Sequence, residues 1–133
     1  MYRPIISALF GALAVILTVW LGLGELLGAH PFWDVQVALV GAPIGALIAM
    51  LLGWLERSGA ALLAGAAILI VGLVMAMRGK MAFASSYAED LFSGALWYYG
   101  WITIFIGAAL AIAALFSRAS GLAGRPSAPP PLG

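Results

Sequence analysis

Four long apolar stretches constrain the fold of this chain more than any other feature of its sequence. They cover about residues 4–28, 35–55, 59–77 and 94–116, and Glu25 is the one charged residue inside them. A helix that crosses the hydrocarbon core of a bilayer needs about 20 mostly apolar residues. The chain is 65% hydrophobic and 8% charged, whereas soluble proteins average about 45–50% and about 25%. The sequence therefore predicts an all-α integral membrane protein with a four-transmembrane-helix bundle.

The segments between these stretches differ in length and character. Residues 29–34 end at Asp34, which we expect to cap the second helix. The next connection, residues 56–58, is so short that the second and third helices should form an antiparallel hairpin. Residues 78–93 carry apolar side chains near helical spacing, which predicts a short interfacial helix before the last span. Residues 1–117 are thus one transmembrane domain, and the proline-rich residues 118–133 are a disordered cytoplasmic tail.

The basic residues predict the orientation, because Lys and Arg are enriched in cytoplasmic loops. With a cytoplasmic N-terminus, that side carries four basic residues and the other side carries two: Arg3, Arg57, Arg118 and Arg125 against Arg78 and Lys80. We therefore expect a multi-pass protein of the cell (inner) membrane with both termini in the cytoplasm. The first stretch is longer than the apolar region of about 7–15 residues in a signal peptide, so it is predicted to stay in place as a helix.

Small residues indicate how the helices pack, because helices in lipid associate through close backbone contact rather than through the hydrophobic effect. One seam at spacings of three and four runs along each stretch: Ser7, Gly11, Ala14, Thr18, Gly22 and Glu25; Ala38, Gly41, Gly45, Ala49 and Gly53; Ala61, Gly65, Ile68, Gly72 and Ala76; Gly100, Thr103, Gly107, Ala111 and Ala114. One seam per helix predicts a compact bundle, although abundant Gly and Ala can also produce such seams by chance. Pro43 should bend the second helix, because proline cannot donate the backbone hydrogen bond to Leu39.

Glu25 is the most informative single position, because an ionisable residue in a membrane helix indicates a functional site. Its place on the first seam predicts that it faces the bundle near the outer end. One interpretation makes Glu25 a proton- or cation-binding group with a pKa raised by desolvation. The other makes it an interfacial residue that reaches lipid headgroups or clamps the first helix to Arg78 or Lys80.

His30 and Asp34 lie just beyond the same helix end. The candidate ion or partner site therefore comprises Glu25, His30, Asp34, Arg78 and Lys80. Two carboxylates and a histidine can ligate a metal, but Pro31 interrupts the spacing between them. We predict no metal site here and interpret His30 as a turn residue.

Several kinds of chemistry are excluded by the residue types present. Cysteine is absent and His30 is the single histidine, which rules out thiolate sites and a haem held by two histidines of this chain. Six basic residues stand against five acidic ones, without a basic block of the kind that binds nucleic acid. No serine or threonine near His30 forms a nucleophile-like arrangement. We therefore predict no catalytic residues, no cofactor, no nucleic-acid partner and no enzyme activity.

Two functional hypotheses follow from this pattern. The first is a non-catalytic integral membrane subunit or accessory protein of a larger membrane complex. The alternative is a small oligomeric transporter or channel, or a small subunit of a transporter, which moves a cation or small solute by using Glu25. The expected partners are the lipid bilayer together with other membrane protein subunits or further copies of the same chain.

Overall fold

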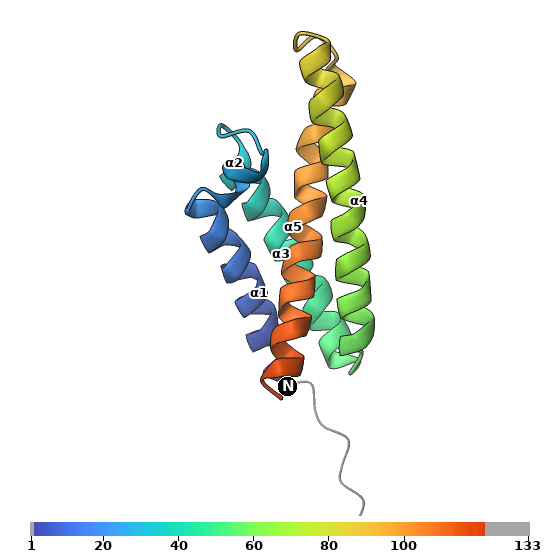
Figure 1. Cartoon of the computed structure of the whole chain (residues 1–133). Coiled ribbons are helices and arrows are strands. Elements are labelled where there is room, and N and C mark those ends of the chain that lie inside the picture. Colours follow the sequence, from blue (N-terminus) through green and yellow to red (C-terminus); the bar gives the residue numbers. More distant parts are fainter. Residues whose placement is uncertain (1, 122–133) are drawn as a thin grey trace, which may run out of the picture.

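The structure, a computed structural model, describes residues 2–121, and these residues form five helices (Figure 1). They are α1 (Arg3–Trp20), α2 (Leu23–Leu27), α3 (Asp34–Trp54), α4 (Ser58–Ser85) and α5 (Leu91–Ala119). All except α2 are long and apolar enough to cross a membrane. The prediction of an all-helical chain with four such helices is confirmed. The predicted tail begins too early, because α5 continues through Ala119; residues 122–133, with Arg125, lie outside the described residues.

The last helix, α5, is the centre of the arrangement. It packs against α1, α3 and α4, as its position between them in Figure 1 shows. The turn of residues 55–57 joins α3 to α4 as tightly as expected, yet α4 lies along α5 and has little contact with α3. The predicted hairpin of the second and third helices is therefore wrong in its packing, because the small-residue face of α4 matches that of α5.

Glycines let α4 and α5 pack backbone to backbone. A Cβ atom added at Gly72 would lie 2.6 Å from the backbone nitrogen of Ile104, and one at Gly65 would lie 2.7 Å from that of Ala111. The contact is reciprocal, since a Cβ at Gly100 would lie 2.5 Å from the nitrogen of Ala76. Seven-residue steps such as Gly65 to Gly72 keep one face toward the partner along a left-handed crossing. The seams predicted for these two helices are confirmed at their glycines.

The first predicted span is wrong at its outer end. α1 stops at Trp20, and the short α2 follows after Gly22, whose φ of +93° is a left-handed conformation that glycine adopts without steric cost. The predicted seam is buried at Ser7 and Gly11, but the buried face departs from it further along α1. Val15 and Val19 are buried, whereas Thr18 is exposed and donates a hydrogen bond to the carbonyl oxygen of Val15 at 2.8 Å. Because Thr18 is satisfied within its own helix, it does not need a partner across the bundle.

The predicted interfacial helix before the last span is also absent from the described chain. α4 runs without interruption to Ser85, and the connection to α5 is only residues 86–90. Gly79, just beyond the predicted third span, lies inside α4 and packs against α5: a Cβ there would lie 2.7 Å from the carbonyl oxygen of Ser93 and would overlap the backbone nitrogen of Trp97. This glycine serves packing rather than helix termination.

Pro43 lies exposed inside α3, which is continuous from Asp34 to Trp54. The helix thus tolerates the missing backbone donor, and the size of the expected bend stays a prediction. Asp34 is the first residue of α3 rather than its cap, and Trp33 holds the cap position without a side-chain hydrogen bond.

The α4–α5 contact predicts opposite effects for two glycine substitutions. Gly72→Ala should lower the midpoint of thermal unfolding in detergent, because its methyl group must push α4 away from α5 at a cost of about 1–3 kcal/mol. Gly59→Ala is the matched control in the same helix, since a Cβ there would meet only the Arg118 side chain at 3.5 Å. It should leave the midpoint unchanged or raise it, because Ala favours helix by up to about 1 kcal/mol over Gly. Equal effects of the two substitutions would contradict the packing.

Candidate functional site

Glu25 does not face the bundle as predicted. It lies exposed on α2, beyond the end of α1, because the left-handed Gly22 interrupts the helix that the prediction took to be continuous. Arg78 is also exposed, on α4, and neither side chain forms an ion pair with another charged residue in the described part of the chain. Among residues 2–121, no group of three or more His, Asp or Glu side chains is placed to hold a metal ion.

The other members of the predicted site gather around an aromatic cluster. This cluster consists of His30, Trp33, Trp97 and Tyr98. The rings of Trp33 and Trp97 meet edge to face with centroids 5.3 Å apart, and Tyr98 contacts Trp33 at 5.2 Å. His30 stacks on Trp33 at 5.9 Å and meets the edge of Trp97 at 5.7 Å. Edge-to-face pairs of this kind add stability beyond the area that they bury, so the cluster joins the α2–α3 connection to α5.

Lys80 and Gly28 complete this junction from two further elements. The ammonium nitrogen of Lys80 lies 5.7 Å from the centroid of the Trp97 ring, a cation–π distance. The indole nitrogen of Trp97 donates a hydrogen bond to the carbonyl oxygen of Gly28 at 3.2 Å. Trp97 therefore fixes both the end of α2 and the outer part of α4.

Two residues of the predicted site are satisfied locally. The Nδ1 atom of His30 accepts a hydrogen bond from the backbone N–H of Phe32 at 3.1 Å, as expected for a turn histidine. Asp34 is buried, and its carboxylate accepts a hydrogen bond from the backbone N–H of Val35 at 2.7 Å. A negative charge in the first turn of a helix is stabilised by the helix dipole, which gives Asp34 a structural role at the start of α3.

The aromatic cluster borders a cavity that opens toward the end of α4. Its volume is about 380 Å³, and its walls include Phe83 of α4 and Leu91 of α5 in addition to the cluster. A cavity of this size, with aromatic walls and the polar edges of His30 and Tyr98, can accept an apolar or aromatic side chain of a partner.

The hairpin tip, defined here as residues 81–93, lies next to this cavity. Asp90 caps α5: the hydroxyl of Ser93 donates to its carboxylate at 2.7 Å and the backbone N–H of Ser93 donates at 3.1 Å. These hydrogen bonds hold the pKa of Asp90 below its ordinary value of 3.8. The tip is thus an ordered turn that presents acidic and apolar side chains together.

The sequence indicated the aromatic side chains but not their cluster. Trp33 and Trp97 are far apart in the sequence, and the packing of α3 against α5 brings them into contact. With this geometry established, comparisons of the chain with protein-family models, curated proteins and solved structures found no match.

Trp97→Phe should loosen the junction at the outer end. Phenylalanine keeps an aromatic ring but loses the hydrogen bond to Gly28, a loss of about 1 kcal/mol. Hydrogen exchange of residues 28–34 should therefore accelerate relative to wild type. Tyr99→Phe is the control, because Tyr99 is exposed and phenylalanine keeps the ring that contacts Tyr98. Exchange that is unchanged in Trp97→Phe would contradict the role assigned to this indole.

The cap of α5 should weaken in acid. Since the pKa of Asp90 is lowered by folding, its carboxylate stabilises the helix start above the unfolded pKa and loses this effect as the pH falls through the folded value. Protection of the Ser93 amide from exchange should fall below about pH 4, the region where an ordinary Asp titrates. Asp90→Asn should retain a capping side chain without this pH dependence. A wild-type profile as flat as that of Asp90→Asn would refute the assignment.

Proposed function

We propose that this chain is a non-catalytic integral membrane subunit that docks on a larger membrane complex through its hairpin tip and the adjoining aromatic cavity. The observation that carries this proposal is the exposure of large apolar side chains on the tip, beyond the part of the bundle that fits a bilayer.

The four spans do not have equal lengths. At 1.5 Å per residue, α1 with 18 residues is about 27 Å long and α3 with 21 residues about 31 Å, close to the hydrocarbon thickness of about 30 Å. α4 has 28 residues and α5 has 29, so these helices are about 42 Å and about 44 Å long. A tilt of about 20° would shorten this reach by only about 3 Å. The α4–α5 pair thus extends past α1 and α3 at the outer end, as Figure 1 shows.

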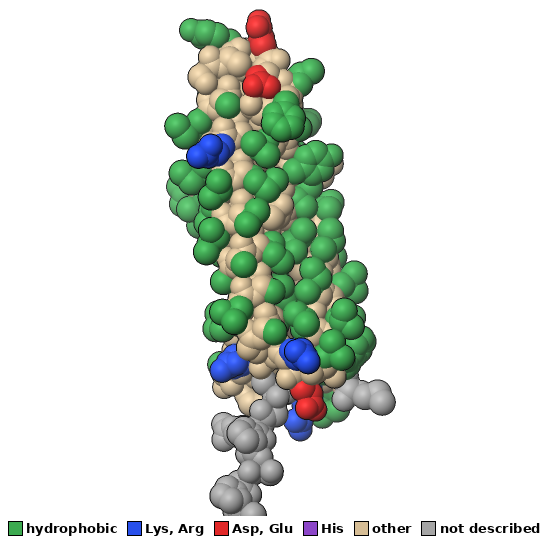
Figure 2. All heavy atoms as spheres, turned by 90° about the vertical axis from the view of Figure 1, so that its right-hand side faces the viewer, with side chains coloured by type: hydrophobic (Ala, Val, Ile, Leu, Met, Phe, Trp, Pro, Cys, Tyr) green, Lys and Arg blue, Asp and Glu red, His purple; other side chains and the backbone are tan. Residues whose placement is uncertain are grey.

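Charged side chains mark the level at which the hairpin would leave the lipid. Figure 2 shows a long apolar stretch between basic side chains, with acidic side chains beyond them at the upper end and another acidic side chain among the basic ones at the lower end. Arg78 and Lys80 are the basic residues of α4 near the outer end, and Glu89 and Asp90 follow in the connection to α5. Such basic residues extend toward headgroups, which supports a bilayer boundary near Arg78 and a tip in water.

The tip is more apolar than a surface in water usually is. Tyr87 is 91% exposed, Leu91 81% and Phe92 76%, and Met81 is exposed beside them. Contiguous apolar side chains on a water-facing surface are typical of protein interaction sites. Tyr87 and Ala88 also have positive φ values of 57° and 64°, so the turn holds Tyr87 outward at a conformational cost. The acidic Glu89 and Asp90 favour a partner with basic residues around an apolar centre.

The interior supports a scaffold in preference to a pore. α5 contacts all three other spans, and its contacts with α3 and α4 are at backbone distance: a Cβ at Gly41 would lie 2.7 Å from the carbonyl oxygen of Ile102. The fully buried Leu110 and Val37 lie among alanines. The alternative, cation or solute transport by an oligomer that uses Glu25, loses the bundle-facing position on which it was based, because Glu25 is exposed on α2.

Leu91→Ser combined with Phe92→Ser should release the chain from its complex. Each side chain of this size contributes about 1.5–3 kcal/mol when buried, so the pair should weaken docking at least a hundredfold, at about 1.4 kcal/mol per factor of ten. Phe32→Ser is the matched control, because Phe32 is 87% exposed at the same end but lies outside the tip. Native gel mobility and mass spectrometry of mild-detergent extracts from the native membrane provide the measurement.

Three results would overturn this proposal. The wild-type chain could migrate alone, its large species could contain only copies of itself, or the tip and control variants could behave identically. Proton or cation flux in vesicles that contain only the purified wild-type protein, abolished by Glu25→Gln, would establish the transport alternative instead.

A further inference from the structure

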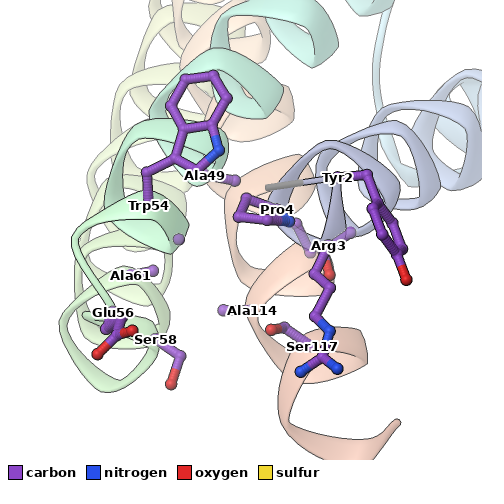
Figure 3. A pocket seen from close by; sticks show the side chains of 13 residues that line it. Tyr2, Arg3, Pro4, Ala49, Trp54, Glu56, Ser58, Ala61, Ala114 and Ser117 are labelled. Carbon is purple, nitrogen blue, oxygen red and sulfur yellow. The ribbon is translucent and has the colours of Figure 1, made fainter. Parts of the chain in front are cut away.

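A second and larger cavity lies at the opposite end of the bundle, where the chain begins. Its volume is about 570 Å³, and it lies between the start of α1, the end of α3, the start of α4 and the end of α5. Figure 3 shows Arg3 and Ser117 on one side, with Glu56 of the α3–α4 turn and Ser58 of α4 on the other. The deeper wall is apolar and includes Ala113. This cavity is therefore amphipathic, with charged groups at the mouth and small apolar residues inside.

Ser7 indicates that the cavity binds a ligand. The residue lines the cavity, is only 5% exposed, and its hydroxyl has no hydrogen-bond partner in the described part of the chain. Buried hydroxyls in folded proteins are nearly always paired, and a serine in a helix commonly bonds to the carbonyl of the preceding turn. An unpaired hydroxyl on a cavity wall is satisfied when the bound molecule supplies an acceptor or donor.

Arg3 and Ser7 are one helical turn apart and share a face of α1. Arg3 is at the mouth, and Ser7 is a turn deeper toward the middle of the bundle. A guanidinium is suited to a phosphate, which it binds through paired hydrogen bonds. From the mouth inward, the cavity presents first the guanidinium of Arg3 and then the hydroxyl of Ser7. A phospholipid presents its phosphate and then its glycerol ester in the same sequence, from the headgroup toward the acyl chains.

Glu56 supplies the opposite charge from the facing wall. It forms no ion pair with Arg3 or with any other described residue. Its φ of 56° places it in the left-handed region, where Gly is the usual residue at a helix C-terminus. The backbone N–H of Arg57 bonds to the carbonyl oxygen of Leu52 at 2.9 Å, which closes the helix and holds this turn. A second negative charge on the ligand would be repelled here, whereas an ammonium group would be attracted.

We propose that this cavity binds the headgroup of a zwitterionic aminophospholipid, of the phosphatidylethanolamine class. Arg3 binds the phosphate, Glu56 together with the hydroxyl of Ser58 accepts hydrogen bonds from the primary ammonium, and Ser7 donates to an ester carbonyl. The volume suits a headgroup and glycerol, so the acyl chains lie outside the cavity along the apolar helices. The inference rests on the membrane location in the proposed function but not on the hairpin tip or its partner.

Lipid retention tests this proposal directly. The purified chain is stripped of lipid in detergent and titrated with phosphatidylethanolamine, phosphatidylcholine or phosphatidylglycerol, and bound lipid is counted by native mass spectrometry. Phosphatidylethanolamine should bind at least about tenfold more tightly than the other two, since each lacks one of the matched groups. Glu56→Gln should remove this preference, whereas Arg3→Gln should weaken the binding of all three lipids, because all three carry the phosphate. Arg57→Gln is the matched control, because Arg57 adjoins Glu56 but does not line the cavity, and it should bind as wild type does.

Ser7→Ala separates binding from folding, because it removes a single oxygen. The lipid-free variant should unfold at the same temperature as wild type or higher, since it loses an unpaired buried hydroxyl. The rise in unfolding temperature that phosphatidylethanolamine produces in wild type should be smaller in the variant. Loss of stability in the lipid-free variant would contradict the unpaired hydroxyl and with it the proposal.

Other ligands produce different outcomes, each of which overturns the proposal. Preference for phosphatidylglycerol that survives Glu56→Gln indicates an anionic-lipid site centred on Arg3. Preference for phosphatidylcholine indicates recognition of a quaternary ammonium by Tyr2 and Trp54 at the rim. Soluble glycerophosphoethanolamine that binds as tightly as the lipid indicates a small-molecule site rather than a lipid site. None of these results depends on docking by the tip, so failure of one proposal is distinguishable from failure of the other.

Discussion

The close approach of α5 to the other long helices is the contact on which the rest of the structure depends. In lipid, apolar side chains gain nothing by leaving their surroundings for one another, so helices associate where backbones come within van der Waals distance. Gly41 on α3 and Gly72 on α4 give α5 this access from two sides. Because α5 fills the centre, the two cavities described above lie at the ends of the bundle. The smaller, aromatic cavity is at one end and the larger, amphipathic cavity is at the other.

The number of apolar helices could be predicted because it depends on the number and length of the apolar stretches, but their ends could not. Gly22 ends a helix and Gly79 lies inside one. Gly22 lies between two leucines and Gly79 between Arg78 and Lys80, so the flanking residues alone would place the break at the wrong glycine. The difference comes from their partners: Gly79 is pressed against the backbone of α5, whereas a Cβ at Gly22 would meet no atom within 4 Å. Helix termination in this chain is therefore decided by tertiary packing as much as by residue type.

The candidate sites were also predictable to different degrees, because tertiary packing decides which residues are brought together. The spacing of Arg3 and Ser7 is visible in the sequence as one helical turn, although it points to a site only when Glu56 is brought opposite by the α3–α4 turn. The position of Glu25 was predicted from a periodicity that assumed an unbroken first helix. Once Gly22 interrupts that helix, the periodicity no longer determines which way Glu25 points.

The central position of α5 has a consequence for biogenesis. Synthesis from the N-terminus makes α1, α3 and α4 before α5. α1 and α3 contact each other and can pair at once, whereas α4 has few contacts with α3 and must wait for the last helix. During this interval the row of glycines on α4 has no helix to pack against. Completion of the bundle is thus coupled to completion of the chain, because α4 gains its main contacts only when α5 is made.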